Sequence, residues 1–178
     1  MKYIITGVCG LLGSQILKRL CKEGHQVIGI DNLFSGYYTN VYEGIETFIE
    51  EDLNNFSAVK NALEEAGAHN ADAIIHCAAL PYEGVSVYSP HLISKNIVSA
   101  TTSVGALAIH FKIPRVINFS SMARYGDQIP PFIEDMKPLG VDPYGLSKIH
   151  AEEHLNLLSD IHGINVTHVV PHNVSGPH

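Results

Sequence analysis

The stretch Ile4-Ile5-Thr6-Gly7-Val8-Cys9-Gly10-Leu11-Leu12-Gly13 decides the fold that this sequence predicts. Residues 3–5 form an apolar run, which is typical of a buried parallel strand. An amphipathic helix is predicted over residues 11–21. The apolar side chains that share one face of this helix are Leu12, Ile16 and Leu20. A strand, a glycine turn and a helix in this order are the setting that a dinucleotide-binding fingerprint requires.

In such a fingerprint, glycine is needed at each of the three positions for a different physical reason. Gly7 allows the sharp turn out of the strand, Gly10 lets the main chain approach a pyrophosphate, and Gly13 lets the helix lie close on the sheet. The N–H groups at the positive end of the helix then face the phosphates. Because the spacing is G-x-x-G-x-x-G rather than G-x-G-x-x-G, a tight structural turn without a ligand is the alternative interpretation.

An acidic residue, Asp31, follows the strand that is predicted over residues 26–30 and precedes Asn32 and Leu33. It lies 18 residues after Gly13, close to the interval at which a carboxylate binds the adenosine ribose. Such a carboxylate accepts hydrogen bonds from both ribose hydroxyls and repels a 2′-phosphate, which favours NAD over NADP. The alternative interpretation is an ordinary turn aspartate.

Strands and helices alternate along the whole chain. Strands are predicted over residues 3–5, 26–30, 45–49, 72–77, 114–119 and 164–170. Helices are predicted over residues 11–21, 56–66, 90–111 and 143–162, with loops over residues 34–43 and 128–141. This alternation predicts an α/β protein with a doubly wound parallel sheet that helices cover on both faces. We expect a single domain over residues 1–178.

Three further places carry residues that suit a cofactor site. Asp52 lies where a doubly wound sheet would present a side chain to an adenine. Ala78 and Ala79 are small enough for a cofactor to lie flat on the strand end, although close packing without a ligand is the alternative. Asn96 is either a buried hydrogen-bonding group or a surface residue, next to an apolar stripe at helical spacing. The stripe consists of Ile93, Ile97, Ala100, Val104, Leu107 and Phe111.

The composition excludes several classes of protein. Hydrophobic residues make up 46% and charged residues 16% of the chain, which suits a globular α/β protein. The net charge of −7 disfavours a general nucleic-acid or acidic-membrane surface. We expect no run as long as a membrane span and no signal peptide before the first strand. Cys9, Cys21 and Cys77 have no disulfide or metal spacing, so reduced thiols in a cytoplasmic protein are expected.

The 11 histidines raise the hypothesis of a metal site at His168, His172 and His178. These three lie across a strand and a Pro-rich loop, without a helical i, i+4 pair among them and without neighbouring cysteines. We therefore expect surface or core histidines and no metal.

Tyr144 and Lys148 lie four residues apart at the start of a predicted helix, so their side chains share one face. An ammonium beside a phenol favours the phenolate, and a positive nicotinamide ring would add to this effect. The tyrosine could then act as a general base near neutral pH, which a phenol with a pKa of about 10 could not. Ser121, at the end of the fifth strand, could hydrogen-bond the same substrate hydroxyl. Alone, the Tyr-x-x-x-Lys spacing is common and mostly structural.

Taken together, these motifs resemble those of the NAD-dependent epimerase/dehydratases of the extended short-chain dehydrogenase/reductase family, which includes UDP-glucose 4-epimerases. Their order and intervals match the family from Met1 to His178. The matching motifs are Thr6-Gly7-x-x-Gly10-x-x-Gly13, Asp31-Asn32-Leu33, Asp52-Leu53, His76-x-Ala78-Ala79, Asn96, Ser120-Ser121-x-x-x-Tyr125-Gly126, Tyr144-x-x-x-Lys148 and Pro171-x-Asn173-Val174-x-Gly176-Pro177.

The resemblance implies a role for each matching residue. Ser121, Tyr144 and Lys148 would be the catalytic triad, and Asn173 would touch a nucleotide sugar, most simply a UDP-sugar. The residues that would hold NAD are Gly7, Gly10, Leu12, Gly13, Asp31, Asn32, Asp52, Leu53, Ala78, Ala79, Asn96, Tyr144 and Lys148.

The implied chemistry is a transient hydride transfer at the sugar C4, with Tyr144 as the base. The resulting 4-keto sugar is then reduced on its other face or loses water, depending on the subfamily. The resemblance also implies a homodimer through the helices over residues 90–111 and 143–162.

Family members continue well beyond the Asn-Val-x-Gly-Pro motif into a smaller substrate domain. We therefore expect a C-terminally truncated chain that lacks most of that domain, and that binds NAD with little or no turnover. Val170 and Ser175 also stand where many relatives carry arginine and tyrosine. The alternatives to an epimerase or dehydratase are a non-catalytic NAD-binding remnant and a module that only dimerises.

Overall fold

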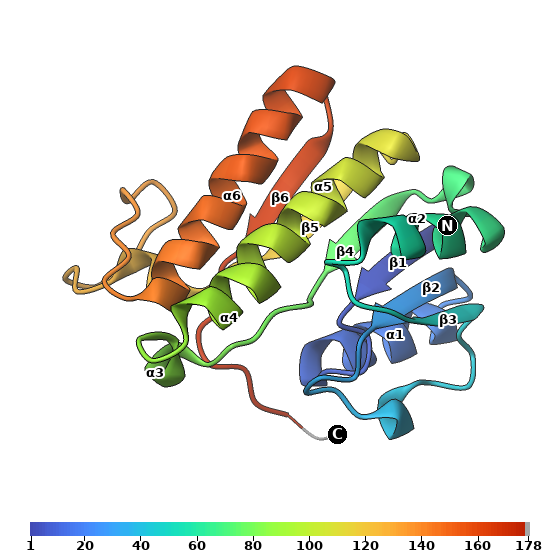
Figure 1. Ribbon diagram of the computed structural model, residues 1–178, viewed down its shortest axis with the longest axis horizontal. Coiled ribbons are helices and arrows are strands. Elements are labelled where there is room, and N and C mark those ends of the chain that lie inside the picture. The colour runs from blue at the N-terminus through green and yellow to red at the C-terminus, as the bar shows by residue number, and fades with distance from the viewer. Residues whose placement is uncertain (177–178) are drawn as a thin grey trace.

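Residues 1–176, which the computed structural model describes, form a six-stranded parallel sheet in the order β3-β2-β1-β4-β5-β6 (Figure 1). The strands are β1 (Lys2–Thr6), β2 (Gln26–Asp31), β3 (Thr47–Glu50), β4 (Ala73–His76), β5 (Arg115–Phe119) and β6 (Asn165–Val169). The chain winds outward from β1 to β3 and then crosses to β4 on the other side of β1. This order confirms the doubly wound sheet, with its switch point between β1 and β4.

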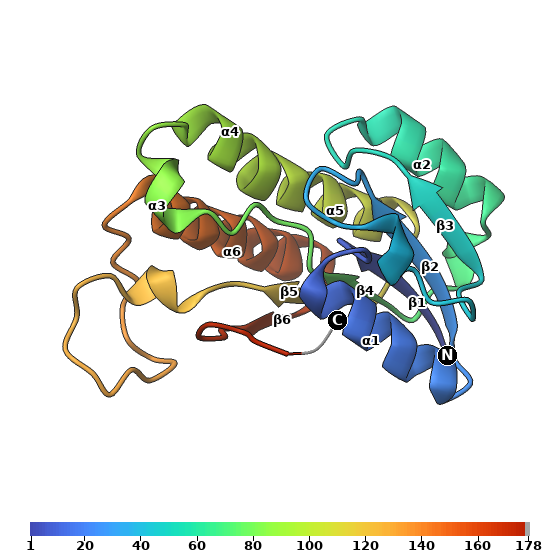
Figure 2. The same ribbon diagram turned by 90° about the horizontal axis from the view of Figure 1, so that it is seen from below.

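The helices divide between the two faces of the sheet (Figure 2). They are α1 (Leu11–Lys22), α2 (Phe56–Glu65), α3 (Glu83–Ser86), α4 (Pro90–Ser94), α5 (Ala100–His110) and α6 (Pro143–His162). Helix α1 packs against β1 and β2 on one face, while α2, α5 and α6 lie on the other. This division follows from the right-handed crossovers that parallel strands require.

The predicted helix over residues 90–111 is continuous in the structure, but its middle is a π-helical turn, Lys95–Ser99, between α4 and α5. Its predicted apolar stripe is buried, from Ile93 (1% exposed) to Phe111 (1% exposed). It supplies much of the core on the α5 face, together with Ile4, Ile74 and other strand residues. The wide turn places Asn96 at the carboxyl ends of the strands, where such bulges often accompany functional sites.

On α1, Ile16 and Leu20 of the predicted apolar face pack half-buried against the core, and Leu17 beside them is fully buried. One expectation about packing needs correction, because helices do not cover both faces of the sheet at β6. On the α1 face of β6, Asn165, Thr167 and Val169 are exposed.

One helical segment, Pro90–His110, is long and apolar enough to cross a membrane by length and composition, with a mean hydropathy of 1.3. The expectation that no run reaches this length is therefore wrong. Val104 and Leu107 of the segment are fully buried against the sheet, and Ile97 is fully buried against α6. An apolar core helix of an α/β protein passes the same test, because its buried face must be apolar.

Gly13→Ala tests the close contact of α1 with the glycine turn. A Cβ at Gly13 would lie 2.1 Å from the carbonyl oxygen of Gly7, so main chain must shift to admit it. We expect a loss of about 2–3 kcal/mol in the free energy of unfolding, measured by urea denaturation. Gly84→Ala is the control, since no atom lies within 4 Å of its added Cβ. Equal stability of both variants would contradict the contact.

Because His76 is buried, we expect the free energy of unfolding to fall at acid pH. It is 2% exposed, between the hydroxyls of Thr6 (Nδ1 to Oγ1, 2.7 Å) and Thr101 (Nε2 to Oγ1, 3.0 Å). Burial, with a contribution from the charge of Lys148, lowers the pKa of His76 to about 3. Between pH 3 and the ordinary value of 6.5 the unfolded chain binds the extra proton, so stability falls as the pH drops.

The contribution of His76 changes the free energy of unfolding by about 1 kcal/mol per pH unit in this range. We expect urea denaturation at pH 4–7 to show a shallower pH dependence in His76→Gln than in the unmutated chain. The exposed His154 gives the control variant His154→Gln, which should keep the original slope. A slope that His76→Gln leaves unchanged would contradict a neutral buried imidazole.

Candidate functional site

A small cavity of about 90 Å³ and a larger cleft of about 820 Å³ adjoin each other at the carboxyl ends of the strands. Parallel α/β sheets bind ligands at this edge, next to the switch point. The residues that line both spaces are Gly7, Gly10, Ser35, Cys77 and Ala79. The two spaces therefore form one continuous site, with the glycine turn at its centre.

The glycine turn brings the main chains of β1, α1 and β4 into direct contact. Gly7 has a φ of +69°, and a Cβ there would lie 2.6 Å from the main-chain nitrogen of Ala78. A Cβ at Gly13 would lie 2.1 Å from the carbonyl oxygen of Gly7. Gly10 donates its N–H to the same carbonyl at 3.1 Å. The predicted reasons for Gly7 and Gly13 are thus correct, and the N-terminus of α1 faces the larger cleft through Leu11 and Leu12.

Asp31, at the end of β2, is 9% exposed and lines the small cavity. Its Oδ2 accepts the N–H of Cys9 at 2.8 Å, and its Oδ1 accepts the N–H of Leu33 at 2.9 Å. The second bond holds Leu33 in a left-handed conformation with a φ of +56°. Asp31 therefore has the structural role of a turn aspartate, while each carboxylate oxygen keeps a second lone pair for a ligand.

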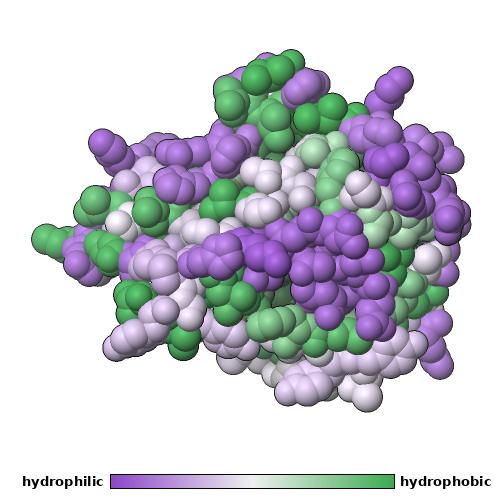
Figure 3. Space-filling model, in the orientation of Figure 1, coloured by the Kyte–Doolittle hydropathy of each residue, from purple (hydrophilic) through white to green (hydrophobic). Residues whose placement is uncertain are grey.

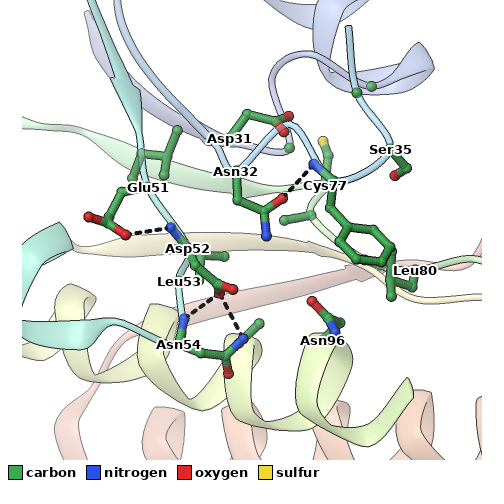
Figure 4. Close-up of a pocket in the computed structure, with 18 residues that line it drawn as sticks. Asp31, Asn32, Ser35, Glu51, Asp52, Leu53, Asn54, Cys77, Leu80 and Asn96 are labelled. Carbon is green, nitrogen blue, oxygen red and sulfur yellow. Dashed lines mark hydrogen bonds between the residues drawn. The ribbon is translucent and has the colours of Figure 1, made fainter. Parts of the chain in front are cut away.

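Asp52 and its neighbours form the other wall of the small cavity (Figure 4). Its Oδ1 accepts hydrogen bonds from the main chain and the side chain of Asn54, both at 2.8 Å. Burial acts to raise the pKa of the Asp52 carboxyl. The hydrogen bonds from Asn54 and Asn32 and the charge of Lys95 outweigh burial, so its pKa lies below its ordinary value. Asp52 is therefore ionised near neutral pH.

Most of the remaining residues predicted to bind a cofactor also line the small cavity. Asn96 projects from the π-helical turn and donates from Nδ2 to the Leu92 carbonyl at 2.9 Å, which leaves its Oδ1 toward the cavity (Figure 4). Leu53, Ala78 and Ala79 complete the wall. Every predicted cofactor residue thus lines one of the two spaces, the last two, Tyr144 and Lys148, in the larger cleft.

The larger cleft brings Ser121, Tyr144 and Lys148 together, as the sequence predicts. Tyr144 and Lys148 are buried on the same face of α6, with exposed fractions of 7% and 6%. Lys148 donates from Nζ to the Phe119 carbonyl at 2.9 Å, and its Nζ lies 5.9 Å from the centre of the Tyr144 ring. Asn173 also lines this cleft and is exposed.

The expected activation of Tyr144 is not present in this structure. Burial raises the pKa of the Tyr144 phenol above 10, and a hydrogen bond with Ser121 offsets only part of the rise. Lys148 is bonded to main chain instead of to the phenol, and burial lowers its own pKa to about 8. The effect of burial on the phenol therefore opposes the effect that was expected from Lys148 and a positive nicotinamide ring together.

Two carboxylates near Tyr144 were missed by the sequence analysis. Asp142 caps α6 by accepting the N–H of Gly145 at 2.8 Å. Glu83, in α3, lines the larger cleft. Burial and the adjacent Asp142 raise the pKa of the Glu83 carboxyl, and both carboxylates raise the pKa of Tyr144. An Asp before Pro143 is a recognisable cap signal, whereas nothing in the sequence places the four-residue helix α3 against α6.

The histidines behind the metal hypothesis have other partners. His168 bonds Asn118 (Nδ1 to Nδ2, 3.1 Å) and Asn156 (Nε2 to Oδ1, 2.9 Å). His172 stacks against Phe132, and His178 lies outside the described residues. Among residues 1–176, no group of three or more His, Cys, Asp or Glu side chains has an arrangement that could hold a metal ion.

Comparisons with known proteins agree with this geometry. Residues 3–178 match the sequence model of the NAD dependent epimerase/dehydratase family. The chain is 29% identical to the UDP-glucuronate 4-epimerase of Thermodesulfobacterium geofontis, over 98% of this chain and 56% of that protein. It is 28% identical to the UDP-glucose 4-epimerase of Mycolicibacterium smegmatis, over 99% of this chain and 57% of that protein.

A solved structure resembles the whole described fold. The UDP-glucose 4-epimerase from Brucella ovis, crystallised in complex with NAD, superposes with a TM-score of 0.91 at 29% identity. The match covers 99% of this chain and 53% of that one, so the chain spans about half the length of the relatives it matches. The fold, the switch-point site and the match of nearly every residue to the family model place this chain in the NAD dependent epimerase/dehydratase family.

Proposed function

We propose that this chain binds NAD across the carboxyl ends of its strands. The observation that carries the proposal is that Gly7 and Gly10 of the glycine turn line one cavity together with the Asp31 carboxylate, which belongs to the next strand. The turn also fits the group, since a Cβ at Gly7 or Gly13 would collide with main chain. The structure of the Brucella ovis relative in complex with NAD supports NAD as the ligand.

In this proposal the adenosine half of NAD lies in the small cavity and the nicotinamide half lies in the larger cleft. Gly7, Gly10, Leu12 and Gly13 hold the pyrophosphate, and the remaining residues hold the adenosine or the nicotinamide ribose. These remaining residues are Asp31, Asn32, Asp52, Leu53, Ala78, Ala79, Asn96, Tyr144 and Lys148. Asp31 and Asp52 put two carboxylates in the small cavity, which disfavours the extra phosphate of NADP.

We propose further that the family chemistry of this site is the 4-epimerisation of a UDP-sugar. NAD, when bound, accepts the hydride of the sugar C4 and returns it. Tyr144 takes the proton of the C4 hydroxyl, Ser121 orients that hydroxyl, and Asn173 contacts the nucleotide sugar. A positive nicotinamide near Tyr144 would favour the phenolate in addition to Lys148, and would counter the burial that raises the pKa of the phenol.

For residues 1–178 alone we propose NAD binding with little or no turnover. The relatives are nearly twice as long, so about half of the protein that acts on the sugar in them has no counterpart among these residues. A dehydratase remains the second candidate for the chemistry, since the matched family includes both reactions. An NAD-binding remnant without catalysis is the alternative for the chain as a whole.

We propose a homodimer through the helical segments over residues 90–111 and 143–162, in a cytoplasmic protein. Figure 3 shows hydrophobic residues at the top of the molecule, where α6 ends. On α6, Leu146, Leu157 and Ile161 are exposed by 45%, 56% and 63%. Large apolar side chains gathered on one helix are the kind of surface that a second chain covers.

Asp31 sets the first prediction for this function. NAD should raise the melting temperature more than NADP does, since binding to the folded chain alone stabilises it. Asp31→Ala removes the carboxylate and should shrink the ratio of the NAD to the NADP affinity by about tenfold. The ratio is measured by titration calorimetry, so that any loss of folded protein affects both ligands alike.

Glu23→Ala is the control, because Glu23 carries the same charge outside the two cavities. It should leave the ratio unchanged. Equal affinity for NAD and NADP in the unmutated chain would contradict the role of Asp31.

Tyr144→Phe sets the second prediction. The 178-residue chain should give little or no UDP-galactose from UDP-glucose, while NAD still protects it from thermal unfolding. Any NADH formed from NAD and UDP-glucose, followed at 340 nm, should disappear in Tyr144→Phe without loss of NAD binding, because only the proton acceptor is removed. Robust turnover by these residues would contradict the need for the second half.

A further inference from the structure

Glu152 is a buried carboxylate that the proposed mechanism does not use. It lies on α6, is 4% exposed, and pairs from Oε2 with Nη2 of Arg124 at 3.2 Å. Its Oε1 accepts the hydroxyl of Ser120. The Nε of Arg124 is buried without a hydrogen-bond partner within residues 1–176. A buried charge pair of this kind often adds no more stability than apolar side chains would, so stability alone does not account for it.

The contacts of Glu152 connect two parts of the candidate site. Helix α6 holds the end of β5 at two consecutive residues, through Lys148 to the Phe119 carbonyl and through Glu152 to Ser120. The next residue is Ser121, which lines the larger cleft and caps the turn Met122–Tyr125 by accepting the N–H of Ala123 at 3.2 Å. Any shift of this turn along α6 would therefore move Ser121 relative to the helix that carries Tyr144.

Arg124 connects the turn Met122–Tyr125 to Glu152 by a second contact. It belongs to the turn itself, and its carbonyl accepts the N–H of Leu139 at 2.7 Å, which ties in the loop over residues 128–141. Its guanidinium lies 5.3 Å from the centre of the Tyr125 ring. Glu152 thus binds the chain on both sides of Ser121, through Ser120 before it and through Arg124 within the turn.

We propose that Glu152 is a positioning residue of the candidate active site, which fixes the turn carrying Ser121 to α6 and supplies a negative charge one helical turn from Lys148. The proposal rests on the proposed function for the meaning of the site. Its test does not depend on that function, because the titration of the Lys148 side chain can be followed in the protein without NAD or substrate.

The charges around Lys148 define what the test should show. Burial lowers the pKa of Lys148 to about 8, and Cys77 and Glu152 act to raise it. His76 lies behind Lys148 and is neutral, and burial raises the pKa of the Cys77 thiol to about 12, so that this group is also neutral near pH 8. Glu152 is therefore the negative charge that stabilises the Lys148 ammonium in this range.

The experiment follows the Lys148 side chain by NMR of the chain with ¹³C-labelled lysine, between pH 6 and 11. Lys148→Arg identifies the signal. The unmutated chain should titrate near pH 8. Glu152→Gln should lower the midpoint of the Lys148 titration by about 0.5 pH unit or more, because the carboxylate that stabilises the ammonium is removed. Glu153→Gln, which removes an exposed charge from the neighbouring position, should leave the midpoint unchanged.

A second variant separates positioning from stability. Arg124→Met/Glu152→Met replaces the buried pair by apolar side chains, and should recover the melting temperature that Glu152→Gln loses. It should still show the lowered Lys148 midpoint and a NAD affinity at least about tenfold below that of the unmutated chain. Where Glu152→Gln does not fold, the midpoint is read in this double variant.

A Lys148 midpoint that stays at the unmutated value in whichever of these variants folds, or an equal change in Glu153→Gln, overturns the proposal. So does a double variant that recovers NAD affinity together with stability, since Glu152 would then act on the fold alone. Failure of the unmutated chain to bind NAD contradicts the proposed function instead, and the Lys148 midpoints still decide the role of Glu152.

Discussion

The contact between two stretches of main chain at the switch point is the constraint on which the rest of the structure depends. Gly7 touches Ala78, and Gly13 touches Gly7, at distances that leave no room for a Cβ. These contacts bring β1, β4 and the start of α1 to one place. They also leave the adjoining strand ends open, so that the small cavity and the larger cleft meet there. A side chain at either glycine would force these main chains apart at the place where the two spaces meet.

Electrostatics divides this site into two unlike halves. Asp31 and Asp52 make the small cavity acidic, which suits ribose hydroxyls and an adenine amino group and disfavours added phosphate. The larger cleft instead contains a buried cation, Lys148, beside a phenol whose pKa is raised by burial. Because burial raises its pKa, the phenol stays protonated near neutral pH. The arrangement suits a base that becomes effective only when a positively charged ring occupies the cleft.

Most of the fold could be predicted from local patterns, and the candidate site from those patterns together with the resemblance to the family. The glycine triplet, Asp31 and the Tyr144–Lys148 pair belong to strand ends and a helix start, whose positions in a doubly wound sheet follow from topology. The helix predicted over residues 143–162 has those bounds in the structure, and Gly163 ends it with a φ of +71°. What failed depends on tertiary packing, which sequence periodicity does not encode.

Three residues illustrate this limit. Glu83 reaches Asp142 only because α3 packs on α6, and Arg124 reaches Glu152 only because the turn after β5 folds over α6. The pKa of Tyr144 rises because of burial, which spacing cannot reveal.

The binding of NAD across the strand ends is most directly tested by a crystal structure of this chain soaked in excess NAD. We predict the pyrophosphate against the main-chain N–H groups of Gly10–Leu12 and the ribose hydroxyls on Asp31; a cleft that stays empty at saturating NAD would contradict the account.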